Sequence, residues 1–395
     1  MSTLKVDGIR SNSASSDAIT LASDGTCTAN ITSINSTQLS HRRININGGM
    51  EVAQRGTSAS VSDGSNEGYS TLDRWRTLYS SSAGGAATMS QDSDVPTDYS
   101  WGRFSKSLKM DVTTADTSIA SNHAITLQYR IEAQDLRNSG WDYTNSNSIL
   151  SVSFWAKSVK AGTYCVALNS QDGTTTDIVK EYTLAANTWK HIELEFPGNS
   201  GLQIDDNNDS GLNVLWALVV GTDRHLTAGS WTTRSGEAKY GSSNQVNFYD
   251  STDNNFFLTG VQIEVGKATV FEHWSYADEL ARCQRYYYAH IRGSDEGVGN
   301  FTVYQANDLF GYIPFPVEMR GIPSLVTSND TDHFVNFAEA SSDTFNSFAS
   351  LWDKSKRGVF VNVNASQGVS RAASAKSCMV TSGNAASKLA FNAEL

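Results

Sequence analysis

Three tryptophans lie in polar, turn-rich stretches of the sequence: Trp101, Trp141 and Trp231. A flat indole ring on a loop can stack against the C–H face of a sugar, while nearby Asn, Asp and Gln side chains bind its hydroxyl groups. The same rings could instead plug a loop or contact another subunit. The sequence therefore offers three candidate glycan-binding residues and leaves both interpretations open. Trp155 and Trp216, by contrast, lie in apolar strand-like runs and are predicted to be core residues.

The densest acidic segment is 205–211, with the sequence DDNNDSG. Asp205, Asn207 and Asp209 supply the carboxylate and amide oxygens that calcium prefers. The segment is not an EF-hand loop, because Ser210 stands at the glycine position and Trp216 at the position of the bidentate glutamate. Either a structural calcium site or a solvated turn fits this pattern, and no other cofactor is expected.

His41, Arg42 and Arg43 form the one compact basic cluster of the sequence. Such a cluster between two segments is either a solvated linker or an anchoring contact to an acidic partner surface. Its place between an N-terminal segment and a larger domain suits the second interpretation, and both stay open.

No catalytic motif is present in the sequence. The seven histidines are dispersed, and no HExxH, GxSxG, P-loop or dinucleotide fingerprint occurs. None of the four cysteines forms a CxxC pair. A glycosidase needs only two carboxylates, which 41 acidic residues cannot exclude. Even so, the sequence shows no β-helix repeat. We expect a protein that is not an enzyme.

The composition excludes several functional classes. Of 395 residues, 10% are aromatic, which argues against a disordered chain. The net charge of −11 argues against sequence-independent binding to nucleic acid and against binding to an anionic membrane. The longest apolar run, 214–220, is too short to span a bilayer, and residues 1–10 lack the apolar core of a secretory signal. We therefore expect neither nucleic-acid binding nor membrane insertion.

Alternating apolar residues define the main domain. They recur in short runs at 125–131, 150–156, 164–168, 192–196 and 257–263. A period of two with one apolar face is typical of half-buried strands, and the continuous run 214–220 predicts a strand covered on both faces. Turn-rich spacers such as 171–175 separate these runs. The pattern predicts an antiparallel β-sandwich or jelly roll over residues 44–274.

Three further segments flank the sandwich. Residues 275–288 are predicted to be a short helix, because Ser275 and Asp278 fit a capping box. Residues 289–395 return to short strands and predict a C-terminal β domain. Residues 1–43 contain short β-like runs but too few apolar residues to bury a core. This N-terminal segment must therefore attach to another protein or be completed by copies of itself, and we predict a homotrimer.

Two motifs bracket the sandwich and carry a resemblance. The segment 46–57 (INGGMEVAQRGT) precedes Asp73, Arg74 and Trp75, and the segment 257–266 (FLTGVQIEVG) precedes the predicted helix. Together they resemble a group of tailed-phage structural proteins, common in marine and cyanobacterial phages, described as tail-fibre-like or minor structural proteins. The segments 151–157 (SVSFWAK) and 162–164 (GTY) are similar to jelly-roll carbohydrate-binding modules, which often bind structural calcium.

The resemblance implies a virion protein. Its first implied role is a short tail fibre or receptor-binding component that adheres to host-surface glycans, with other tail or capsid proteins as partners. The alternative is a protein that decorates the capsid or tail without any ligand. A glycan-cleaving enzyme is a third interpretation.

Overall fold

The computed structural model describes residues 6–10, 19–21, 23, 27–29, 41–305, 307–338, 341–369 and 377–395. Strands form most of the regular structure and helices are few and short, which confirms the predicted all-β fold. By the contacts between Cα atoms, the chain divides into two units, Met1–His41 and Arg42–Leu395.

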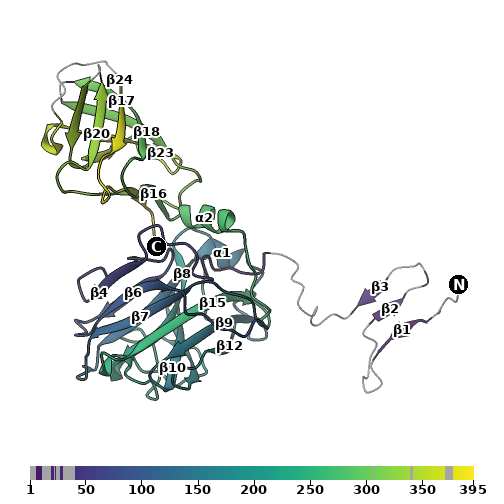
Figure 1. Ribbon diagram of the computed structural model, residues 1–395. Coiled ribbons are helices and arrows are strands. Elements are labelled where there is room, and N and C mark those ends of the chain that lie inside the picture. The colour runs from purple at the N-terminus through teal and green to yellow at the C-terminus, as the bar shows by residue number, and fades with distance from the viewer. Residues whose placement is uncertain are drawn as a thin grey trace. The chain divides into compact units, whose positions relative to one another are not determined.

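The first unit contains a small antiparallel sheet (Figure 1). Its strands are β1 (Gly8–Ile9), β2 (Ile19–Leu21) and β3 (Cys27–Ala29). The side chains of Ile9 and Leu21 are 53% and 41% exposed, so these strands bury little apolar surface. Attachment or trimer formation by this segment stays a prediction.

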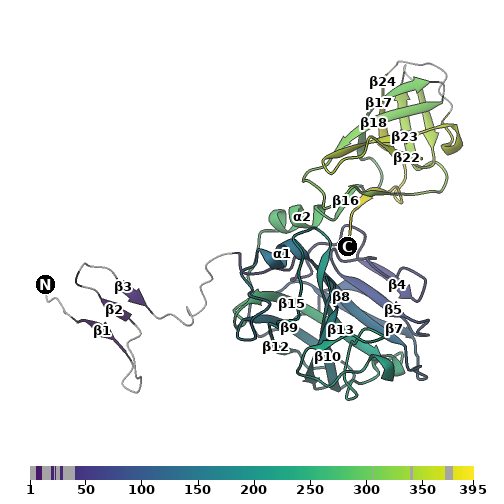
Figure 2. The ribbon, with the colours of Figure 1, turned by 180° about the vertical axis from the view of Figure 1, so that it is seen from behind.

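Two six-stranded antiparallel sheets form a β-sandwich of jelly-roll type at the start of the second unit (Figures 1 and 2). The first, called the β13 sheet, has the order β14 (Thr232–Thr233), β11 (Thr176–Leu184), β10 (Gly162–Ser170), β13 (Ser210–Val220), β8 (Ala124–Glu132) and β5 (Arg76–Ser80). The second, called the β9 sheet, has the order β12 (Lys190–Pro197), β9 (Ile149–Ser158), β15 (Asn255–Val265), β7 (Ser107–Thr114), β6 (Ala86–Asp92) and β4 (Ser58–Ser62).

The core between the two sheets is rich in aromatic residues. Trp216 in β13 is fully buried, and its ring lies 5.3 Å from Trp75 and 5.7 Å from Phe154, centroid to centroid. On the opposite face of β13, Leu215 and Ala217 are buried in a second apolar cluster. The prediction that 214–220 is covered on both faces is therefore confirmed.

The outer face of the β9 sheet is covered by the loop 93–106. Phe104 from this loop packs with Trp155 of β9 and Phe271, and Trp155 is only 5% exposed. The approach is close at Gly260 in β15, where φ is +59° and an added Cβ would lie 2.5 Å from the Phe104 ring. A glycine is needed there both for its backbone conformation and for space.

The predicted helix is present but shorter than expected. It is α2 (Tyr276–Gln284), and the Ser275 hydroxyl accepts a hydrogen bond from the backbone N–H of Asp278. The prediction that it reaches residue 288 is wrong, because Tyr287 begins strand β16 (Tyr287–Ile291). No helix among the described residues is long and apolar enough to cross a membrane. The other helical segments are α1 (Ala133–Arg137), η1 (Thr222–Arg224), η2 (Phe248–Asp250) and η3 (Ala365–Gln367).

Two further antiparallel sheets follow α2 and share a core of their own. A three-stranded sheet has the order β16, β25 (Leu389–Asn392) and β19 (Ser324–Thr327). A seven-stranded sheet, called the β18 sheet, has the order β21 (Ser341–Phe345), β20 (Phe334–Ala338), β24 (Ser377–Ser382), β17 (Gly297–Gln305), β18 (Asp308–Pro314), β23 (Gly358–Val363) and β22 (Ser350–Trp352).

Buried ion pairs join these C-terminal sheets to the sandwich. Glu394 follows β25 and pairs with Arg74, and its other oxygen lies 3.2 Å from Nη2 of Arg55. All three side chains are at most 5% exposed. Arg285 at the end of α2 forms a two-pronged contact with Glu132, at 3.0 and 2.9 Å.

Candidate functional site

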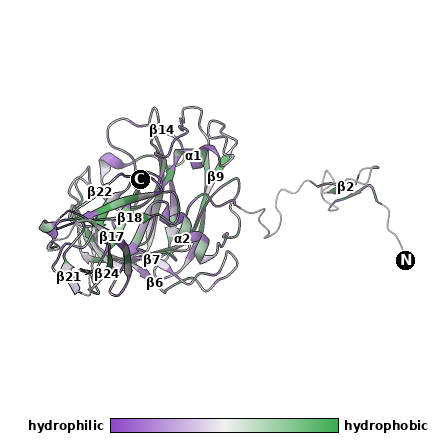
Figure 3. Cartoon of the chain, turned by 90° about the horizontal axis from the view of Figure 1, so that it is seen from above, coloured by the Kyte–Doolittle hydropathy of each residue, from purple (hydrophilic) through white to green (hydrophobic). Residues whose placement is uncertain are grey.

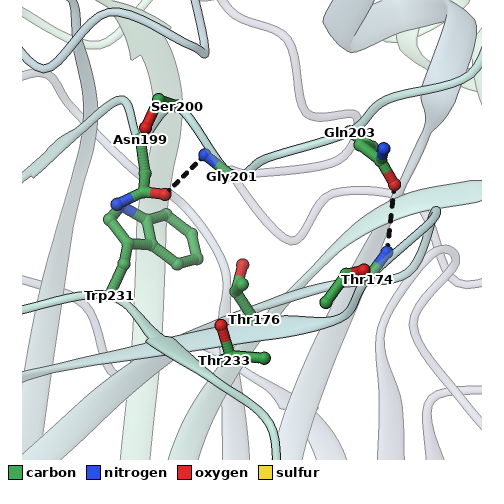
Figure 4. A pocket seen from close by; sticks show the side chains of 8 residues that line it. All are labelled: Thr174, Thr176, Asn199, Ser200, Gly201, Gln203, Trp231 and Thr233. Carbon is green, nitrogen blue, oxygen red and sulfur yellow. Dashed lines mark hydrogen bonds between the residues drawn. The ribbon is translucent and has the colours of Figure 1, made fainter.

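A hollow of about 410 Å³ opens at one edge of the β13 sheet (Figure 4). Three chain segments line it: the turn between β10 and β11, the loop between β12 and β13, and strand β14 with the residue before it. The lining residues are Thr174, Thr176, Asn199, Ser200, Gly201, Gln203, Trp231 and Thr233.

Trp231 forms one wall of this pocket (Figure 4). Its indole Nε1–H donates to the carbonyl oxygen of Pro197, at 2.7 Å, and the ring is half-buried against the sandwich core. This bond uses the polar edge of the indole and fixes the ring beside Asn199. The ring can therefore contribute its face to a ligand, while its donor is already satisfied.

Side-chain amides hold both sides of the pocket. Opposite Trp231, the Thr174 backbone N–H donates to Oε1 of Gln203 at 3.0 Å, and beside Trp231 the Gly201 N–H donates to Oδ1 of Asn199 at 2.8 Å (Figure 4). Gly173 has φ of +57°, and a Cβ there would collide with the Gln203 side chain. These bonds order both loops and leave amide and hydroxyl groups facing the hollow.

The floor of the pocket rests on a buried ion pair. Thr176 in β11 lies opposite Thr233 in β14. The adjacent Asp177 is fully buried and binds Arg234 through two oxygens, at 2.6 and 3.1 Å. This pair ties the two-residue edge strand β14 to the sheet, so the pocket has a rigid base.

The chemistry of the lining is neutral. It consists of hydroxyl groups, amides and one indole, with no Asp, Glu, His, Cys, Lys or Arg side chain among the eight residues. Such a surface matches a ligand rich in hydroxyl groups and C–H faces. The lining therefore offers hydrogen-bond donors and acceptors together with one aromatic face.

The predicted calcium ligands lie beside this pocket, in the same loop as Gln203. The Asp205 N–H donates to Oδ2 of Asp172 at 3.0 Å, and the Asp209 N–H donates to Oδ1 of Asn207 at 2.9 Å. Burial raises the pKa of Asp172, and the charges of Asp205 and Asp209 add to this. Among the described residues, no group of three or more His, Cys, Asp or Glu is gathered to hold a metal. Calcium binding stays a prediction.

The same loop also has a structural contact. Nη1 of Arg320 donates to the carbonyl oxygen of Asn208 at 2.7 Å and lies 3.5 Å from Oδ1 of Asp209. Arg320 Nε donates in turn to the carbonyl oxygen of Ala393 at 2.8 Å. Arg320 thus bridges the acidic loop of the sandwich and the residues after β25.

The other two candidate tryptophans lie elsewhere. Trp141 is 3% exposed and packs in the sandwich core, so the prediction that it stacks on a sugar is wrong. Trp101 lies in the loop over the β9 sheet, and its ring is stacked on His191 at 4.1 Å with an interplanar angle of 15°. One face of Trp101 is therefore already occupied by the protein. Of the three candidates, Trp231 lines the pocket.

The basic cluster does not form the expected free surface. Arg43 is 2% exposed, pairs with Glu279 of α2 and lies 4.9 Å from the centre of the Phe271 ring. Nε of Arg42 is 3.1 Å from Oε2 of the buried Glu264. Anchoring to an acidic partner is therefore wrong for Arg43, whose acidic partner is internal. His41 is exposed.

Comparison with known proteins gives distant likenesses. No family model matches the chain, and no curated protein matches it. One similar solved structure is the family 11 carbohydrate-binding module of the cellulase Lic26A-Cel5E of Clostridium thermocellum, which is 14% identical, covers 52% of this chain and 94% of that chain, and has a TM-score of 0.27. A putative sugar binding protein from Bacteroides thetaiotaomicron is 11% identical, covers 57% of this chain and all of that chain, and has a TM-score of 0.31.

Proposed function

We propose that this protein binds glycans without cleaving them, through the pocket beside Trp231. The observation that carries the proposal is the pocket lining itself, in which one indole face is combined with hydroxyl and amide groups and with no charged side chain. Sugars are recognised through these two chemistries, stacking on C–H faces and hydrogen bonds to hydroxyl groups.

The charges around the pocket narrow the ligand class. Asp172 lies two residues before the lining residue Thr174, and Asp205 lies two residues after the lining residue Gln203. The chain carries a net charge of −11. An acidic rim repels polyanions, so neutral sugars are the ligands that this pocket accepts best. The ligand of the proposal is a neutral, hydroxyl-rich host-surface polysaccharide.

The biological setting of the proposal is a phage particle. The motifs at 46–57 and 257–266 support a virion location, as a tail-fibre or receptor-binding component held by other tail or capsid proteins. A single small sugar site binds at roughly millimolar to micromolar affinity. Useful adhesion then needs several sites on one particle, which the proposed homotrimer supplies through avidity.

The test is a titration of purified full-length protein with neutral envelope polysaccharide from host cells, followed by calorimetry. Trp231→Ala should weaken binding by about tenfold or more, the loss of one stacking contact. Tyr99→Ala is the control, because Tyr99 is 57% exposed in the loop 93–106 and does not line the pocket. Circular dichroism checks that both variants keep the fold.

Three results would count against the proposal. Equal binding by the parent and Trp231→Ala would remove the pocket from the function. Absence of any saccharide binding by the parent would favour a decoration protein without a ligand. Release of reducing ends from the polysaccharide would instead indicate a glycan-cleaving enzyme.

A further inference from the structure

The outer face of the β18 sheet carries a row of large apolar side chains. The strand pairings place Phe337 opposite Met379, Met379 opposite Asn300, Tyr312 opposite Phe360, and Phe360 opposite Trp352. These residues come from β20, β24, β17, β18, β23 and β22, so the row crosses six neighbouring strands. Hydrophobic residues are visible along β18 in Figure 3.

This row is exposed rather than covered. Trp352 and Met379 are 54% and 58% exposed, and Tyr304, whose ring packs against Phe310 on the same face, is 70% exposed. Five aromatic side chains of the face are on average about half exposed: Tyr304, Tyr312, Phe337, Trp352 and Phe360. At about 200 Å² for each side chain, they present roughly 500 Å² to solvent. That is well over half of the ~800 Å² that one partner contributes to a standard protein interface. A patch of this size on one face marks an interaction surface.

The ring geometry argues against a sugar as the occupant. Tyr304 and Phe310 are inclined at 70°, Phe310 and Trp352 at 81°, and Tyr312 and Phe360 at 55°. A polysaccharide stacks on rings that lie in one plane, whereas two of these pairs stand edge-to-face and the third is tilted, as aromatic side chains are in a protein core. The row is therefore shaped for contact with protein side chains.

The charge and relief of the face point to a second copy of this chain. The large side chains of the row are uncharged, and Asp308 is the one charged residue of β18 on this face, whereas the chain carries a net charge of −11. Two acidic copies repel wherever their charged surfaces meet, so contact through a face with little charge is favoured. Asn300 and Thr302, both smaller, lie between Met379 on one side and Tyr312 with Phe310 on the other. We propose that this face joins copies of the chain, with the large side chains of one copy filling the Asn300–Thr302 valley of the next.

The experiment measures the mass of the full-length protein by sedimentation velocity at micromolar concentration. The parent should have the mass of two or more chains. Met379→Glu, which places a charge in the contact of every copy, should raise the dissociation constant by roughly 30-fold or more, the size typical of a hot-spot residue. Met379→Gln is the matched control of similar size without the charge and should weaken association less.

A second variant separates a fitted contact from general stickiness. Thr302→Trp fills the valley and adds apolar surface, so a fitted contact weakens, whereas non-specific association strengthens. Tyr99→Glu, on the sandwich and 57% exposed, should leave the mass unchanged. The proposal is overturned by a monomeric parent, by a Met379→Glu variant that keeps the parent mass, or by stronger association of Thr302→Trp. The N-terminal segment is unchanged in every variant. If that segment alone caused association, the Met379→Glu variant would keep the parent mass.

Discussion

The β9 sheet of the sandwich and the β18 sheet of the C-terminal part both carry aromatic residues on their outer faces, and only one of them is covered. Trp155 of the β9 sheet is buried beneath Phe104 from the loop 93–106. On the β18 sheet, Trp352 is 54% exposed, and no described segment of the chain lies over it. The contrast shows that a loop of the chain itself covers the aromatic residues of the β9 sheet. The exposed outer face of the β18 sheet is therefore the face on which to look for a partner.

The comparison becomes sharpest when a buried and an exposed tryptophan are truncated in turn. Trp216→Ala should lower the free energy of unfolding by about 4 kcal/mol, because a cavity forms between Trp75 and Phe154. Trp352→Ala should change it by less than about 0.5 kcal/mol in the separated chain. Urea denaturation of both variants checks the prediction. Similar losses would mean that Trp352 is covered within its own chain.

The buried ion pairs between the two parts give the next largest effect. Glu394→Gln removes the charge that faces Arg74 and Arg55, and should cost about 3 kcal/mol. The control is Glu318→Gln, because Glu318 pairs with Arg357 at an exposed site, where about 0.5 kcal/mol or less is expected. Both are measured by urea denaturation at pH 7. An equal, small loss in both would show that the junction is open to water.

The smallest expected effect concerns the cover of the β9 sheet. Burial lowers the pKa of His191, which stacks on Trp101, to about 4, against a partly opposing effect of Asp98; Glu193 lies 3.6 Å away. The folded state thus binds fewer protons than the unfolded state between about pH 4 and 6.5. The stability due to neutral His191 is complete above pH 6.5 and lost as the pH falls towards 4.

His191→Phe keeps a ring for stacking and removes this titration, so the variant should lose less stability than the parent between pH 7 and pH 5. Asp73 acts in the opposite direction, because burial raises its pKa to about 6, so the informative quantity is the difference between parent and variant. Urea denaturation at the two pH values measures it. Parallel losses in both proteins would contradict a buried, neutral His191.

The sequence predicts the strands whose inner faces carry large apolar residues. Strand β8 (Ala124–Glu132) and strand β15 (Asn255–Val265) follow from their alternation. Strands β4 (SASVS) and β6 (AATMSQD) carry almost no such residues. Their place in the sheet is fixed by pairing, because β6 pairs with β7 and β4 pairs with β6. The end of α2 is set in the same way, since β16 pairs with β25, about a hundred residues further on.

The candidate site could be predicted only in part. Trp231 and the spacer 171–175 are visible in the sequence, because polar turn residues around an aromatic ring are a local signal. Asn199 and Gln203 give no such signal, since the fold alone brings their loop to Trp231. The prediction that Arg43 contacts another protein is wrong for the same reason, because its partner Glu279 lies 236 residues away in the sequence. The prediction that Trp141 binds a glycan is wrong because its polar sequence neighbours give no sign that its ring is buried in the core.

The pairing of Arg74 with Glu394 spans 320 residues of chain, and this has a consequence for synthesis on the ribosome. At elongation rates of about 5–20 residues per second, the interval between the two codons is on the order of half a minute. Throughout it, the strands around Arg74 are available to fold while the carboxylate that neutralises the guanidinium does not yet exist. The nascent sandwich must therefore keep that corner hydrated until Glu394 has been synthesised, and the corner can close only after that.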